Sequence, residues 1–427
     1  MNAHPDLTDI QAVTARDERP ALLMLTPYLP YPPVSGGRTR TLELIRRLRG
    51  DYQITLVCFG RPEERAFDLA PLRMLCEVMV IDRESSPGTL RAATLSLTSA
   101  QPILMRLYTN TVMRAALAHL IAERRFSLIH VESFYMLQNL PPQINATVPV
   151  LLSEPSIEFN AWRYFSRVAR PIYQRPALII EAFKIRQFEP RSWRTVSAVG
   201  VTSALEGKAV SRAAPDITPL LIPNGVDPDY FQPLDLRRDP DSAVYMGDYK
   251  YFPNVEAIRY FLSAIMPLIR AERPNFTLTL IGKEPPADFQ TLAADPQSGL
   301  HVTGLVDDTR PYLCRGAVFI CPQRSGGGTR LKLLESLACG SPIVSTSIGC
   351  EGLSVIDGEH MLIADTPPAF AAAVLRLLAD PAAAEALGKR GRAWVVQQHS
   401  WDHSAALLRT VYQRLRQSAS TAPELSS

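Results

Sequence analysis

The 427-residue sequence lacks the features that would place it in a membrane, in an oxidising compartment or on nucleic acid. It has no run of about 18 apolar residues, so we expect no membrane-spanning helix. None of its six cysteines stands in Cys-x-x-Cys spacing, so we expect buried reduced thiols rather than a metal site or a disulfide framework. The formal net charge of +3 is too small to indicate nucleic-acid binding.

The two ends of the chain also lack structural signals. Residues 1–20 contain no apolar segment typical of a signal peptide, so we expect a cytoplasmic protein. Residues 1–19 and 418–427 are polar, and we predict that both are disordered. We further expect that the protein uses no metal ion and no cofactor other than its substrates.

The rest of the chain has the pattern of an α/β protein. Apolar runs of strand length alternate with helical stretches, which predicts parallel sheets covered by helices on both faces. We therefore predict two doubly wound, Rossmann-like domains that face a cleft. The predicted units are 20–222 (first domain), 223–241 (hinge), 242–400 (second domain) and 401–417 (terminal helix).

Several elements can be predicted individually from this alternation. The predicted strands are Ala21–Thr26, Tyr52–Phe59, Val78–Asp82, Leu128–Val131, Val148–Leu152, Ala198–Thr202, Val244–Gly247, Phe276–Gly282 and Leu300–Thr303. The predicted helices include Arg38–Arg49, Val255–Arg270 and the amphipathic stretch His403–Arg416.

The stretch from Ala317 to Thr346 carries the strongest signal of a ligand site. An apolar strand leads into a bend with three glycines and then into a helical sequence, which we predict to be capped by Thr329. Glycines let backbone approach a ligand, and a helix N-terminus attracts anions, so a phosphate or diphosphate is the expected ligand. The residues predicted to bind it are Arg324, Gly327, Gly328, Thr329, Arg330 and Lys332.

Two of these basic residues also allow a structural interpretation. Arg330 projects into the apolar arc of the predicted helix, so its stem could pack while its head reaches solvent. Lys332 and Glu335 are three residues apart and could form only a surface ion pair. We favour ligand contact for Arg330, because the neighbouring glycines already require an explanation.

Other loops are expected at the same edge of each sheet. Gly36 and Gly37 follow the first predicted strand, and Gly247 and Lys250 follow the first strand of the second half. Open parallel sheets bind ligands at the carboxyl ends of their strands, so we predict that these residues face the cleft. An ordinary glycine turn is the alternative for Gly36 and Gly37.

Five segments, in this order, resemble the group 1 glycosyltransferases of GT-B fold, and within them the bacterial sugar transferases of exopolysaccharide loci. The segments are PYPPVSGGRTRTLELIRRL, IPNGVDPDYFQP, YMGDYKYFPNVEAIRYF, VTGLVDDTRPYL and GGGTRLKLLESLACGSPIVSTSIGCEGL. The resemblance runs from Pro27 to about Trp401. It implies that a nucleotide-sugar donor binds the second domain and that a glycan or lipid-linked acceptor binds the first.

The resemblance also implies roles for individual residues. Glu335 would hold the nucleotide ribose, and the glycine bend with its basic neighbours would hold the diphosphate. Glu132, and after it His130, would contact a sugar at a strand's carboxyl end, although burial of His130 in the sheet is an open alternative. Gly327 stands where many members have a Glu, so the resemblance implies no particular donor sugar.

Glu158 is the third catalytic candidate. The stretch SEPSIE resembles the Glu-His-Asn-Val-Glu stretch of the branch, with Pro155 and Ser156 in place of His-Asn. Glu158 is retained, although a plain surface turn would explain the segment equally well.

The resemblance therefore implies a retaining glycosyltransferase in polysaccharide biosynthesis that uses a nucleotide sugar. A GT-B nucleotide-sugar epimerase and a non-catalytic GT-B scaffold are the alternatives. The basic segment Lys184–Arg194 could touch the inner membrane face that carries a lipid-linked acceptor. We favour a solvated helix end for this segment, because Pro190 is expected to interrupt any long amphipathic face.

Overall fold

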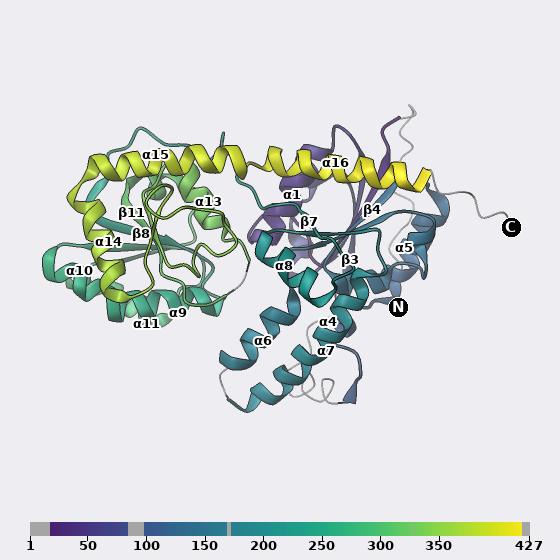
Figure 1. The fold of residues 1–427 in the computed structure, drawn as a ribbon, viewed down its shortest axis with the longest axis horizontal. Coiled ribbons are helices and arrows are strands. Elements are labelled where there is room, and N and C mark those ends of the chain that lie inside the picture. Colours follow the sequence, from purple (N-terminus) through teal and green to yellow (C-terminus); the bar gives the residue numbers. More distant parts are fainter. Residues whose placement is uncertain (1–17, 84–97, 169–171, 327, 421–427) are drawn as a thin grey trace.

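The structure, a computed structural model, describes residues 18–83, 98–168, 172–326 and 328–420. Two α/β domains lie side by side, and the C-terminal helices run along both (Figure 1). The termini predicted to be disordered lie outside the described residues, apart from 18–19 and 418–420.

The N-terminal domain is built on a parallel sheet with the order β3-β2-β1-β4-β5-β6-β7 among the described residues. Its strands are β1 (Ala21–Thr26), β2 (Gln53–Gly60), β3 (Glu77–Asp82), β4 (Leu128–Glu132), β5 (Val150–Glu154), β6 (Ala198–Val201) and β7 (Leu220–Leu221). The strand order reverses between β1 and β4, which is where open α/β sheets form a ligand crevice.

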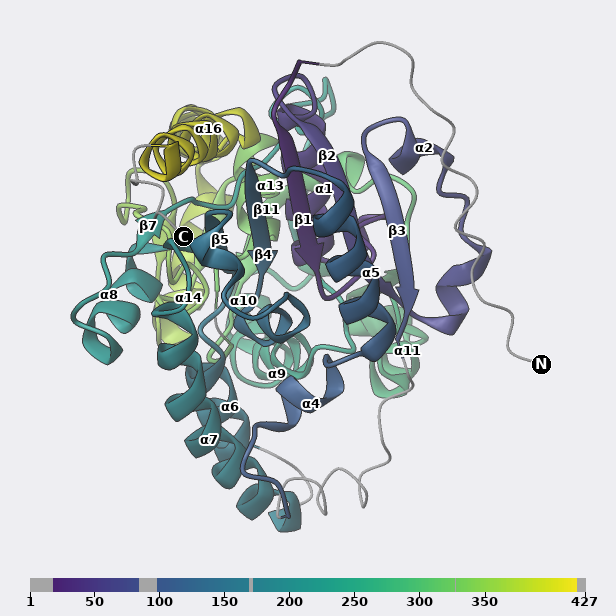
Figure 2. The same ribbon diagram turned by 90° about the vertical axis from the view of Figure 1, so that its right-hand side faces the viewer.

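Helices cover both faces of this sheet. They are α1 (Gly36–Leu48), α2 (Ala70–Arg73), α4 (Ile103–Leu107), α5 (Thr111–Glu123), α6 (Glu158–Val168), α7 (Arg175–Trp193) and α8 (Ala204–Ala213). Helices α6 and α7 form a hairpin that projects away from the sheet in both views (Figures 1 and 2).

Helix α7 runs through Pro190, which we expected to interrupt a long amphipathic face, without a break in the helix. The side chains of Ile185 and Trp193 are fully buried on either side of it, and α7 packs along α6. This packing outweighs the cost of the hydrogen bond that proline cannot make.

The C-terminal domain repeats the plan, with the parallel order β10-β9-β8-β11-β12-β13 among the described residues. Its strands are β8 (Asp239–Met246), β9 (Thr277–Ile281), β10 (Leu300–Gly304), β11 (Gly316–Cys321), β12 (Ile343–Ser345) and β13 (Leu362–Ile363). Its helices are α9 (Phe252–Tyr260), α10 (Met266–Glu272), α11 (Ala287–Ala293), α12 (Arg310–Arg315), α13 (Leu331–Ala338), α14 (Pro367–Ala379) and α15 (Pro381–Gln398).

Two details differ from the prediction. Strand β8 begins at Asp239, inside the segment assigned to the hinge, because Asp239 already pairs with Gly316 of β11. The predicted helix Val255–Arg270 is divided into α9 and α10 by the π-helical turn Phe261–Ile265.

The last helix, α16 (Trp401–Ser420), returns to the N-terminal domain (Figure 1). Leu408, Val411 and Tyr412 are buried in one cluster with residues of α1 and the central strands. Tyr412 meets the ring of Tyr52 edge-on at 5.3 Å, and its hydroxyl contacts His130 Nδ1. The predicted fold class is confirmed, including this crossing helix.

Two chain segments cross between the domains side by side. The Val226 N–H donates to His399 O at 2.7 Å, and the Trp401 N–H donates to Val226 O at 3.1 Å. A Cβ at Gly225 would lie 2.6 Å from Trp401 N, so this close approach requires glycine. The IPNG motif, residues 222–225, therefore lies where the two chain segments that connect the domains meet.

Tyr412→Ala should release α16 from the N-terminal domain. Truncation of a fully buried aromatic side chain costs about 3–5 kcal/mol, so the denaturation midpoint should fall clearly. Chemical denaturation followed by tryptophan fluorescence measures the change. Gln413→Ala, at the neighbouring exposed position, is the control, and equal midpoints for the two variants would contradict the role of Tyr412.

Candidate functional site

The glycine bend connects β11 to α13 at the carboxyl edge of the C-terminal sheet. Gly326 has φ +100° and Gly328 has φ +77°, conformations that favour glycine, while Gly327 lies outside the described residues. Arg330, not Thr329, occupies the N-cap position of α13, so the predicted cap is wrong. The buried hydroxyl of Thr329 has no hydrogen-bond partner among the described residues.

Arg330 lies inside the bend rather than on the surface of the helix. Its side chain is almost fully buried, and its guanidinium donates to the carbonyl oxygens of Gly328 and Ser325. The guanidinium therefore holds the backbone on which the bend depends. Arg330 therefore matches neither of the two alternatives fully, because its guanidinium is buried and already donates to backbone carbonyl oxygens.

Lys332 is held by two partners from the first strand and helix of the domain. Its Nζ donates to Tyr245 Oη and to Asn254 Oδ1, both at 2.9 Å, and lies 4.2 Å from the centre of the Tyr245 ring. Burial lowers the pKa of Lys332 to about 7, because the interior disfavours the charged amine. Protonation of this amine therefore changes near neutral pH.

Glu335 follows Lys332 by about one helical turn, and burial shifts its pKa in the opposite direction. Burial raises the pKa of Glu335 to about 7, while the Lys332 amine acts in the other direction. The pKa values of the two neighbouring side chains are thus shifted toward each other.

Gly247 lies directly against Lys332. A Cβ at Gly247 would lie 2.9 Å from Asn254 Nδ2 and 3.1 Å from Lys332 Nζ, so a side chain there would displace the amine. The structure thus brings Gly247, which follows β8, together with Lys332 of α13, which follows the neighbouring strand β11.

Two predicted basic residues stand apart from this group. Arg324 Nε donates to Glu256 Oε1 at 3.0 Å, and its guanidinium stacks over the Tyr260 ring at 4.0 Å. Lys250 forms an exposed ion pair with Glu284 at 2.7 Å. Both cations are engaged within the C-terminal domain, and sequence spacing gave no sign of their distant partners.

The first helix of the N-terminal domain meets the glycine-bend helix across the domain boundary. A Cβ on Gly36 would lie 3.4 Å from Leu331 Cδ1, so the N-terminal ends of α1 and α13 are close together. At Gly37 a Cβ would lie 2.7 Å from Tyr28 Oη. Both helix ends carry partial positive charge, which favours an anion between them.

A cavity of about 350 Å³ lies between the domains beside the glycine bend. Its C-terminal wall includes Gly326, Gly328 and Tyr251, and its N-terminal wall includes Ile157 and Tyr164 of the loop and helix that follow β5. We call it the inter-domain cavity. The bend therefore opens on a groove between the two sheets, where a ligand can contact both domains.

His130 and Glu132 lie on β4, a central strand of the N-terminal sheet. Both are fully buried, with His130 Nε2 3.4 Å from Glu132 Oε1 and His130 Nδ1 against the Tyr412 hydroxyl. Within the described residues neither carboxylate oxygen of Glu132 has a hydrogen-bond partner. Their contact with a sugar stays a prediction, because both side chains are buried and His130 packs against Tyr412 of α16.

Glu158 begins α6, next to the wall of the inter-domain cavity. Burial raises its carboxyl pKa to about 7. The backbone N–H groups of Glu158 and Phe159 donate to the carboxylate of Glu189, each at 2.9 Å, which fixes the start of α6. Glu189 was missed in the sequence because it lies 31 positions away, on α7.

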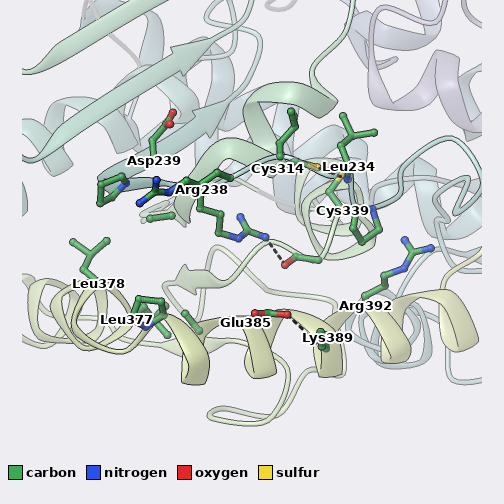
Figure 3. A pocket seen from close by; sticks show the side chains of 18 of the residues that line it. Leu234, Arg238, Asp239, Cys314, Cys339, Leu377, Leu378, Glu385, Lys389 and Arg392 are labelled. Carbon is green, nitrogen blue, oxygen red and sulfur yellow. Dashed lines mark hydrogen bonds and ion pairs between the residues drawn. The ribbon is translucent and has the colours of Figure 1, made fainter.

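A larger cavity, of about 590 Å³, lies elsewhere on the C-terminal domain, beside α15 (Figure 3). It is lined by Asp239 at the amino end of β8 and by Cys314 and Cys339. Arg238 in its wall donates to the carbonyl oxygens of Gly316 and Gly340, at 2.6 and 2.8 Å. Since it lies at the amino ends of the strands, it is not the cavity that the glycine bend faces.

Across the described ranges, no group of three or more His, Cys, Asp or Glu side chains is arranged to hold a metal ion. The six cysteines are all buried and unpaired by disulfides. No helix in the described part of the chain is long and apolar enough to span a bilayer.

Two Rossmann-like domains that face each other, with a terminal helix crossing back, define the GT-B class of folds. The sucrose-phosphate synthase tll1590 of Thermosynechococcus elongatus superimposes with a TM-score of 0.70 at 21% identity, over 93% of this chain and 100% of that one. Alr3699/HepE of Anabaena, in complex with UDP and glucose, superimposes with a TM-score of 0.63 at 12% identity, over 92% and 100%.

The sequence comparisons point the same way. Residues 240–380, within the C-terminal domain, match the family model described as Glycosyl transferases group 1. The chain is 30% identical over 240 residues to the GDP-mannose-dependent alpha-(1-6)-phosphatidylinositol monomannoside mannosyltransferase of Mycolicibacterium smegmatis. That match covers 50% of this chain and 58% of the relative.

Glu335→Gln should change the pH dependence of stability. The folded state holds the Glu335 proton up to about pH 7, whereas an ordinary carboxyl loses it near pH 4.5. The stability of the wild type therefore decreases as the pH rises from about 4.5 to 7. The Tm of Glu335→Gln minus that of wild type should therefore increase from pH 4.5 to 7. Glu335→Asp, which retains a carboxyl, should follow wild type; a constant difference for Glu335→Gln would contradict the raised pKa.

Proposed function

We propose that this protein is a glycosyltransferase that moves a sugar from a nucleoside-diphosphate donor to a glycan or lipid-linked acceptor. The observation that carries the proposal is the glycine bend at the N-terminal end of α13. It contains Arg330, adjoins Lys332 and opens on the inter-domain cavity. The family match within the C-terminal domain and the named activity of the mycobacterial relative support it.

In this proposal the donor diphosphate lies between the ends of α1 and α13. Lys332, when protonated, and the two helix ends would stabilise the charge that develops on the leaving diphosphate. The acceptor oxygen bonds to the anomeric carbon, the bond from that carbon to the phosphate oxygen breaks, and the acceptor proton passes to the departing phosphate. Attack and departure on one face give retention, which we carry over from the resemblance.

We further place the reaction in the cytoplasm and in polysaccharide biosynthesis. The six buried cysteines without disulfides suit a reducing compartment, and the polysaccharide role follows from the resemblance to sugar transferases of exopolysaccharide loci. An epimerase would share the nucleotide site but would act on the nucleotide sugar without an acceptor. Incubation with UDP- or GDP-sugars alone separates the two, because epimerised sugar without acceptor would overturn the transferase assignment.

Arg330→Met should weaken nucleoside-diphosphate binding by roughly tenfold or more, since a hydrogen bond to a charged group contributes about 1.5–3 kcal/mol. Titration calorimetry with UDP and GDP measures the dissociation constant. Arg324→Met is the matched control and should bind nearly as well as wild type, because the Glu256 carboxylate neutralises that guanidinium, whereas the Arg330 guanidinium donates to uncharged carbonyl oxygens. A fall in Tm with unchanged affinity would reassign Arg330 to the bend alone.

The α6–α7 hairpin is the surface that we propose for peripheral membrane contact. Ile179 and Phe183 are 57% and 63% exposed, one turn apart on α7. Ile172 and Tyr173, just before α7, are also exposed, and the exposed Arg186 lies near the same face. Apolar side chains beside a cation suit an anionic bilayer surface.

The variant Ile179→Ser/Phe183→Ser should reduce co-sedimentation with vesicles of phosphatidylglycerol and phosphatidylcholine, because it removes the exposed apolar pair. Val112→Ser, at a 53% exposed position on α5, is the control. Equal sedimentation of all three proteins, or none of wild type, would contradict the membrane contact.

A further inference from the structure

A second pocket lies at the carboxyl ends of β1, β2 and β3, on the N-terminal domain. It measures about 140 Å³ and is lined by Ser35, Arg38, Arg61, Glu64, Arg83 and Tyr108, among others. We call it the arginine pocket. Its volume is roughly tenfold above what one water molecule needs, so it suits a small group such as a phosphate.

Glu64 organises the cationic wall of this pocket. One of its carboxylate oxygens accepts from the Arg38 guanidinium, and the other accepts from the backbone N–H of Arg61 at 2.9 Å. Both side chains of the Arg38–Glu64 pair are at most 10% exposed, so the pair is held firmly. Three guanidinium groups and one carboxylate line the pocket, which leaves its lining positively charged.

Arg83 forms the opposite wall with Tyr108. Its Nη1 donates to the Tyr108 hydroxyl at 2.7 Å, and its guanidinium lies 4.5 Å from the centre of the Tyr108 ring. The Phe59 ring meets Tyr108 edge-on at 5.9 Å. The guanidinium is thus positioned against an aromatic wall, and guanidinium groups bind phosphate oxygens in pairs.

The pocket lies beside the domain boundary. Ser35 precedes Gly36, which meets Leu331 of the C-terminal domain. Glu284 raises the pKa of Lys250 in that domain, and the charge of Arg61 acts in the opposite direction, so Arg61 lies close to Lys250. An occupant of the pocket therefore lies next to the region where the two domains meet.

The pocket also lies near Glu158. Burial raises the pKa of the Tyr108 phenol, and the charges of both Arg83 and Glu158 act on it, so Tyr108 is within range of both side chains. A molecule anchored by its phosphate in the arginine pocket can extend past Tyr108 toward Glu158 and the inter-domain cavity. This arrangement suits the acceptor, because the proposed donor diphosphate occupies the end of α13.

We propose that the arginine pocket binds a phosphate group of the acceptor, so that the acceptor is a phosphate-bearing sugar or lipid. Only the identification of the bound molecule as an acceptor rests on the proposed transferase function. The phosphate site itself can be tested without any turnover, which separates its failure from the failure of the proposed function.

The first test is titration of the full-length protein with methyl phosphate, with and without saturating UDP or GDP. Wild type should bind methyl phosphate equally in both conditions, because the pocket is separate from the donor site. Arg61→Met and Arg83→Met should each weaken this binding by roughly tenfold and leave nucleotide affinity unchanged. Arg83→Lys should recover part of the loss, because it restores the charge without the paired geometry.

Arg125→Met is the matched control, since this exposed arginine precedes β4 at the opposite, amino edge of the sheet. It should bind methyl phosphate as wild type does. Equal affinity of the Arg61 and Arg83 variants and the control would overturn the proposal. So would competition between nucleotide and methyl phosphate, which would make the pocket part of the donor site.

A second probe distinguishes the two sources of the phosphate. Decyl phosphate below its micellar concentration should bind through the same two arginines as methyl phosphate. If decyl phosphate binds more tightly than methyl phosphate, the acceptor is a lipid phosphate. If the two bind equally, the acceptor is a soluble sugar phosphate. Binding of decyl phosphate that is indifferent to Arg61→Met and Arg83→Met would count against the pocket.

Discussion

The buried guanidinium of Arg40 is the contact on which the rest of the arrangement depends. It donates to the carbonyl oxygens of Ile222 and Pro223, at 3.0 and 3.1 Å, and to Asn224 Oδ1 at 2.8 Å. Arg40 lies one turn after the glycines that begin α1, so the helix end at the cleft is tied directly to the segment joining the domains. Ser404 of α16 donates to the same Pro223 carbonyl at 2.8 Å, which brings the terminal helix into the same junction.

The fold was largely predictable because it depends on local pattern. Apolar runs such as Ala21–Thr26 are typical of buried central strands, and β1 has these bounds in the structure. The differences occurred where packing overrides local preference. Pro190 stays helical because α6 covers α7, and Asp239 joins a strand because Gly316 pairs with it. Neither neighbour can be identified from the residues around Pro190 or Asp239.

The site was predictable only in part. The glycines of the bend could be identified because positive φ angles restrict the choice of residue. The partners of the charged residues could not: Lys332 is held by Asn254 from 78 positions away, and Arg324 by Glu256 from 68. Long polar side chains reach whichever acceptor the tertiary fold brings near, so residue type and spacing did not show which arginine or lysine had already been engaged.

The paired crossing at Val226 and Ser400 has a mechanical consequence. Two backbone segments joined by hydrogen bonds resist torsion about either chain, whereas a single connector would swivel. The paired segments therefore allow the domains to bend toward each other but resist rotation of one domain about the connecting chains. The tips of α1 and α13, where Gly36 meets Leu331, are thereby kept at one mutual alignment.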